Sequence, residues 1–125
     1  MTAPVWVNAV IGDFGRAAGL KALALNGRGA TALRFETGVS MRLEYIGGEL
    51  VMAMTVPSAD LKRLLAQSHP RASREFKIRT GVLHRTGEPV MAIRIAERDI
   101  TLSHLNAVFD VLWRLASEVG GETWA

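Results

Sequence analysis

The sequence of 125 residues contains no cysteine. Disulfides and thiolate metal sites are therefore excluded, and the composition is compatible with a cytosolic protein. The uncharged stretch Leu50 to Ala59 is far shorter than the roughly 20 apolar residues that span a bilayer. The first residues also lack the basic start of a secretory signal. We expect one cytoplasmic domain over residues 1–125 that is not associated with a membrane.

Residues that assemble metal or catalytic sites are scarce. His69, His84 and His104 are isolated in the sequence, and none has a histidine or carboxylate at a metal-ligand spacing. The sequence has no Gly-x-Ser-x-Gly nucleophile motif, and its aspartates lie at expected helix starts or polar helix faces. We therefore expect no enzyme activity, no cofactor and no metal ion.

Alternating apolar residues are the clearest pattern in the sequence. They occupy every second position in Thr31 to Glu36, Val39 to Tyr45 and Glu49 to Val56. This period of two predicts three strands, and the short glycine-containing gaps between them predict tight turns. The same alternation over Phe76 to Val82 and over Val90 to Ala96 predicts two further strands. Leu23 to Leu25 is interpreted as a short strand before the Asn26-Gly27 turn.

Helical spacing of apolar residues predicts three helices. The first extends from Pro4 to Gly19, a short one follows Ser58 and ends near His69, and the last begins at Thr101 or Ser103 and ends before Gly120. The order is helix, three strands, helix, two strands, helix. It predicts an α+β fold with a twisted antiparallel sheet and helices packed on it.

Arginine and methionine are the informative side chains. Seven basic residues lie between Lys62 and Arg85 with only Glu75 opposing them, and the whole chain has a formal charge of +3. Such a segment either lies on a solvated face of the protein or attracts an acidic protein, nucleic acid or an anionic membrane surface. Methionines concentrate on the expected strands, where they are either core residues or part of an adaptable apolar surface.

In the order of these patterns along the chain, the protein resembles the class I chaperones of type III secretion, the Tir-chaperone family. The resemblance runs from about Val7 to Val119. It includes IGDFGRAAGL in the first helix, EYIGGELVMAMTV in a strand pair, DLKRLLAQSH, VMAIRIAE and the closing ITLSHLNAVFDVLWRLASEV. The family is mostly acidic, whereas this chain has a pI near 10.0.

The resemblance implies a homodimer that binds the unfolded N-terminal segment of a secreted effector. It implies β-augmentation and groove binding, without a catalytic group. The expected partner contacts are Val10, Phe14, Leu33, Phe35, Met52 and Met54. Each is also a core candidate, and the core interpretation is the favoured one for Phe14 and Phe35. The expected dimer contacts are Leu61, Leu64, Leu65, Phe76 and Ile78.

The alternative is a basic α+β nucleic-acid-binding or regulatory domain. The segment from Lys62 to Arg85 favours it. The near absence of aromatic side chains in that segment counts against it, because Phe76 is its only candidate for base stacking. Nucleic acid is thus the less favoured partner.

Overall fold

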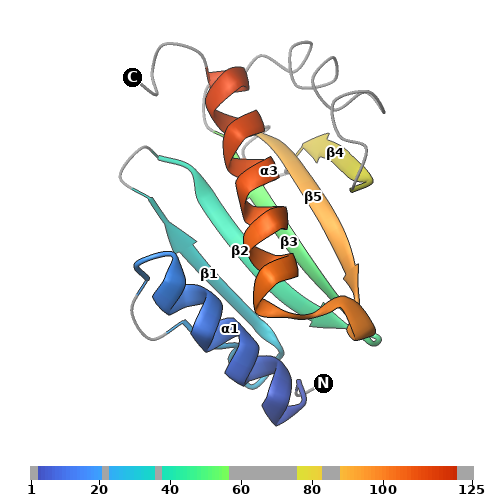
Figure 1. Ribbon diagram of the computed structural model, residues 1–125. Helices are drawn as coiled ribbons and strands as arrows, with labels where there is room; N and C mark the ends of the chain where they lie inside the picture. Colours follow the sequence, from blue (N-terminus) through green and yellow to red (C-terminus); the bar gives the residue numbers. More distant parts are fainter. Residues whose placement is uncertain (1–2, 21–22, 36–37, 57–75, 83–87, 121–125) are drawn as a thin grey trace.

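A computed structural model describes residues 3–20, 23–35, 38–56, 76–82 and 88–120. These residues form two α-helices, one 3-10 helix and a five-stranded sheet (Figure 1). The strand order is β1-β2-β3-β5-β4, and every neighbouring pair is antiparallel. This arrangement confirms the predicted α+β fold. The expected second helix, together with Leu61, Leu64 and Leu65, lies outside the described residues.

The first helix, α1, extends from Val5 to Ala17, with Pro4 as its N-cap residue. At its end Gly19 has φ 78°, a left-handed conformation that only glycine adopts without strain. The amides of Gly19 and Leu20 donate to the carbonyls of Arg16 and Gly15, which completes a Schellman motif. The predicted stop at Gly19 is confirmed.

The strands follow the predicted alternation. They are β1 (Ala30–Arg34), β2 (Ser40–Ile46), β3 (Glu49–Thr55), β4 (Ile78–Val82) and β5 (Pro89–Ala96). Gly47 and Gly48 both have positive φ, 58° and 82°, as a two-residue type I′ hairpin between β2 and β3 requires. The predicted strand at Leu23 to Leu25 is wrong. The Leu25 amide instead donates to Asn8 Oδ1 of α1 at 2.9 Å, so this segment runs along the helix.

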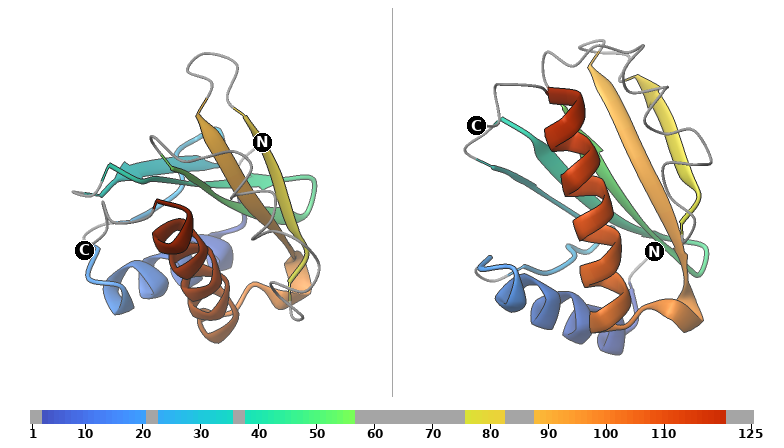
Figure 2. Two further views of the ribbon diagram at one scale, coloured as in Figure 1. Left: turned by 90° about the horizontal axis from the view of Figure 1, so that it is seen from above. Right: turned by 45° about the horizontal axis from the view of Figure 1, so that its top comes forward.

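One face of the sheet is covered by α1 and by α3 (Leu102–Gly120), as both views in Figure 2 show. The buried residues of the strands alternate along this covered face. Met41, Met54 and Met91 are direct cross-strand neighbours on β2, β3 and β5, and all are buried. No helix among the described residues is long and apolar enough to cross a membrane.

The start of α3 is fixed by two polar contacts. Thr101 Oγ1 accepts a hydrogen bond from the His104 amide at 3.1 Å, which confirms Thr101 as the cap. The 3-10 helix η1 (Glu97–Asp99) precedes α3, and Tyr45 of β2 donates its hydroxyl to Glu97 Oε1 at 2.9 Å. This hydrogen bond, the burial of the Tyr45 ring and the negative charge of Glu97 raise the pKa of Tyr45 above its ordinary value of 10.0.

Gly15 is the point of closest approach between α1 and the segment that follows it. A Cβ atom at Gly15 would lie 2.7 Å from Leu23 Cβ, whereas one at Gly12 would lie 3.7 Å from its nearest neighbour. We expect Gly15→Ala to lower the free energy of unfolding by about 1–3 kcal/mol through overpacking. Gly12→Ala is the matched control and should raise it by up to about 1 kcal/mol through helix propensity. Urea unfolding measures both, and equal effects would contradict the packing assigned to Gly15.

The Tyr45–Glu97 hydrogen bond should stabilise the fold only while the hydroxyl keeps its proton. Because the pKa of folded Tyr45 is raised, its contribution is present below about pH 10 and is lost as the pH rises through the folded value. Tyr45→Phe should therefore lower the thermal midpoint at neutral pH, and its difference from the unmodified protein should shrink above about pH 10. A difference that stays constant with pH would show that the hydrogen bond is not its source.

Candidate protein-binding site

The strand β1 is an edge of the sheet, because it pairs only with β2. Gly29 and Phe35 bond directly to β2, through Tyr45 N to Gly29 O and Phe35 N to Val39 O, both at 2.8 Å. Along an antiparallel strand, the backbone N–H and C=O groups of successive residues point alternately toward and away from the neighbouring strand. Because Gly29 and Phe35 point toward β2, the backbone groups of Ala30, Ala32 and Arg34 point away from it. These are the groups to which an added strand would bond.

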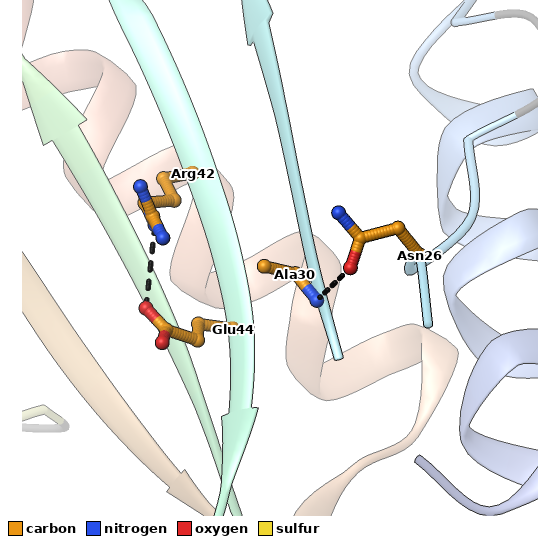
Figure 3. A network of polar contacts seen from close by, with 4 residues as sticks. All are labelled: Asn26, Ala30, Arg42 and Glu44. Atoms are coloured by element: carbon orange, nitrogen blue, oxygen red, sulfur yellow. Dashed lines mark hydrogen bonds and ion pairs between the residues drawn. The ribbon is translucent and has the colours of Figure 1, made fainter. Parts of the chain in front are cut away.

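Asn26 occupies one end of this edge. The backbone amide of Asn26 donates to the Ala30 carbonyl at 2.8 Å. The side-chain Oδ1 of Asn26 accepts a hydrogen bond from the Ala30 backbone amide at 3.2 Å (Figure 3). The outward groups of Ala30 are therefore satisfied within the chain. Those of Ala32 and Arg34 form no hydrogen bond with the part of the chain that the structure describes, and both residues are exposed. The free edge of β1 thus consists of the backbone of these two residues.

Half-buried aromatic side chains lie beside this edge. The ring of Phe35, just after β1, contacts Trp113 and Phe109 of α3 at centroid distances of 4.9 and 6.2 Å. Phe109 in turn meets Phe14 of α1 edge-on at 5.6 Å. We call Phe35, Phe109 and Trp113 the aromatic cluster. Each is partly buried and packs on the core, so each keeps surface that another apolar chain can contact.

The predicted partner contacts separate into two groups. Val10, Leu33 and Phe35 are half-buried at the margin of the core, around α1, β1 and α3. Phe14, Met52 and Met54 are fully buried inside it, so their side chains contact other residues of this chain. Phe14, Met52 and Met54 are therefore core residues, which was the alternative to a partner contact for each of them. Sequence reasoning missed Phe109 and Trp113 as surface residues. Helical spacing assigned Phe109 to the apolar stripe of the last helix, and Trp113 lay outside that stripe without a predicted role.

Two of the five expected dimer contacts can be located. Ile78 begins β4, the opposite edge of the sheet, and Phe76 lies two residues before it. Both are half-buried, and the Phe76 ring meets the His104 ring edge-on at 5.2 Å. Phe76 is therefore engaged with α3, which disfavours it as a stacking platform for nucleic acid bases.

The described residues contain no group of three or more histidine, cysteine, aspartate or glutamate residues that could hold a metal ion. Exposed ion pairs join Asp13 with Arg16 on α1, Arg42 with Glu44 at 3.3 Å on β2, and Arg94 of β5 with Glu49 of β3 at 3.8 Å. Contacts of this kind contribute little to stability. The chemistry that the site can offer is main-chain hydrogen bonding beside an apolar surface.

The family model described as the type III secretory system chaperone SycN matches residues 6–120. This match covers most of the chain, including both edges of the sheet. The chain belongs to this family of type III secretion chaperones. A comparison with curated protein sequences found no match.

Solved structures of similar fold include several complexes. The chaperone matches a chain of the ExsC–ExsE complex with a TM-score of 0.77 and 21% identity, over 98% of this chain and 97% of that one. It matches a chain of the HopA1–SchA chaperone–effector complex with a TM-score of 0.69 and 14% identity, over 90% and 91%. It matches a chain of the Yersinia pestis chaperone SycH in complex with a fragment of YscM2 with a TM-score of 0.67 and 18% identity, over 90% of this chain and 98% of that one. These similarities show the shared fold.

Proposed function

We propose that this chain is a cytoplasmic chaperone that binds, as a homodimer, the N-terminal segment of one or more effectors. It keeps that segment unfolded and competent for export. The observation that carries the proposal is the family match over residues 6–120. The free edge of β1 beside the aromatic cluster supplies a physical means of binding. No catalytic group is needed for this role.

An effector segment can use both parts of the site together. An extended chain added to β1 bonds to the outward amides and carbonyls of Ala32 and Arg34, which gives affinity without a sequence requirement. Its side chains alternate, so every second one faces the helix side of the sheet, where Leu33 and Phe35 lie. Apolar side chains there would pack on the aromatic cluster. The chemistry selects an unfolded segment with alternating apolar residues.

The related structures support an effector as the partner. One is described as a chaperone–effector complex, and others pair ExoT with SpcS and ExoU with SpcU from Pseudomonas aeruginosa. A nucleic-acid-binding domain remains the second candidate only on account of charge. Most of its basic segment lies outside the described residues, and Phe76 packs on His104.

The edge of β1 can be tested with one substitution. Ala32→Pro removes an amide that points away from β2, so it keeps the β1–β2 ladder and blocks an added strand. We expect about tenfold weaker binding of an effector's N-terminal segment, from the lost hydrogen bond and the blocked approach. The measurement is fluorescence anisotropy with that segment, taken from the product of an adjacent gene.

Ala32→Val is the matched control, because it keeps the amide and should bind normally. Thermal unfolding of both variants checks that the fold is intact. Unchanged binding by a folded Ala32→Pro variant would exclude β1 as the docking edge. Co-purification with an effector that lacks its N-terminal segment would contradict the chaperone proposal as stated.

The proposed homodimer uses Leu61, Leu64, Leu65, Phe76 and Ile78, as the family resemblance implies. Light scattering at micromolar concentration should give a dimer, and Leu64→Asp should give a monomer because it places an unpaired charge at an apolar contact. The Ala32→Pro variant should remain a dimer, since β1 lies at the opposite edge from β4. A monomer in the unmodified protein would refute this arrangement.

A further inference from the structure

The sheet has a second face, which points away from α1 and α3. We call it the outer face, and it consists of the strand residues that alternate with the buried ones. Figure 2 shows both described helices on the other side of the sheet. Among the described residues, no helix or strand packs over the outer face. The site proposed at the edge of β1 uses backbone groups and the helix side of the sheet, and it shares with the outer face only Arg34, whose backbone belongs to the edge and whose side chain belongs to the outer face.

The outer face carries an excess of positive charge. Arg34, Arg42, Arg79 and Arg94 have their positions on this face, against the two carboxylates Glu44 and Glu49. Both carboxylates are already paired: Arg42 Nε lies 3.3 Å from Glu44 Oε2 (Figure 3), and Arg94 Nη1 lies 3.8 Å from Glu49 Oε1. This leaves Arg34 and Arg79 without a carboxylate partner in the part of the chain that the structure describes.

These two arginines are at opposite edges of the sheet, on β1 and β4. Four interstrand steps of about 4.8 Å separate the strands, so their backbones lie about 20 Å apart. Between them, β3 and β5 carry four apolar residues on the outer face, Val51 and Ala53 of β3 and Val90 and Ala92 of β5. Ala53 lies directly opposite Ala92, whereas Val51 lies opposite Arg94 and Val90 lies opposite Thr55, so the four residues form a diagonal across the two strands. We call these four residues the small-residue strip.

We propose that the outer face binds an acidic amphipathic helix of a partner protein. The apolar side of that helix would cross the strands and pack on the small-residue strip, where the side chains of Ala53 and Ala92 are short enough to allow close approach. Its carboxylates would pair with Arg34 and Arg79. A helix that spans about 20 Å has about 13 residues. This inference goes beyond the proposed function, because it concerns a different face and requires no effector.

The composition of the face favours a protein over nucleic acid. A phosphate backbone is bound by a continuous row of cations, often with aromatic side chains for base stacking. Here the arginines without a carboxylate partner among the described residues are separated by the small-residue strip, and no aromatic residue lies on the outer face of the described strands. Separated charges that flank apolar surface match an amphipathic helix.

The test uses a labelled helical peptide of about 13 residues, with glutamate on one side and alanine and leucine on the other. Fluorescence anisotropy measures its binding to the full chain. The double variant Arg34→Gln, Arg79→Gln should bind about fivefold more weakly, as expected for two exposed charge pairs. The double variant Arg98→Gln, Arg114→Gln is the matched control. It removes the same charge from η1 and α3, where both arginines are exposed, and should bind as the unmodified chain does.

The small-residue strip is tested separately. Ala53→Asp introduces a carboxylate at its centre and should weaken peptide binding about tenfold by placing an unpaired charge in the contact. Thermal unfolding verifies that each variant is folded. The proposal is overturned if the unmodified chain does not bind the peptide, or if both double variants lose affinity equally. It is also overturned if a single-stranded oligonucleotide competes at equal affinity, because the face is then a phosphate-binding surface.

Discussion

The packing of the two helices on one face of the sheet is the constraint on which the other features depend. Three methionines, Met41, Met54 and Met91, cross the middle of that face as direct neighbours and are buried there. Unbranched, flexible side chains fill the irregular space between a twisted sheet and the helices that lie across it. Because the helices bury the apolar side of the strands, the surfaces that remain available for binding are the edges of the sheet, the margins of the core and the outer face.

Each of these remaining surfaces offers a different kind of recognition. The edge of β1 presents backbone groups, which any extended chain can satisfy, and the aromatic cluster beside it adds apolar contact without strict geometry. The outer face instead presents fixed charges around small side chains. The proposed binding of an unfolded effector segment would need the first kind, since an unfolded segment has no fixed shape to match. The second kind suits a folded partner with a defined surface.

Alternation and turn chemistry predicted most of the fold. The period of two located all five strands, and Gly19, Gly47 and Thr101 marked ends that the structure confirms. The strand expected at Leu23 to Leu25 was wrong, because Asn8 on α1 captures the Leu25 amide, a contact between residues 17 apart that no local pattern encodes. The binding surface was harder to predict for a related reason. Periodicity marks Phe14 and Phe109 alike as apolar, and only the crossing of α1, β1 and α3 decides that the first is fully buried and the second is not.

The hydrogen bonds of Asn26 to Ala30 also bear on self-association through the edge of β1. Open sheet edges can pair with identical chains and lead to aggregation, and a protein that binds other chains through an open edge, as proposed for β1, cannot avoid this hazard by covering the edge. The backbone amide and the side chain of Asn26 bond to both outward groups of Ala30, so two residues of β1, Ala32 and Arg34, keep outward backbone groups that are not bonded within the described part of the chain. A short ladder offers a second copy few backbone hydrogen bonds, whereas an effector segment that binds as proposed would add contacts to the aromatic cluster. We therefore expect Asn26 to limit self-association at this edge while leaving the rest of β1 available for the proposed binding.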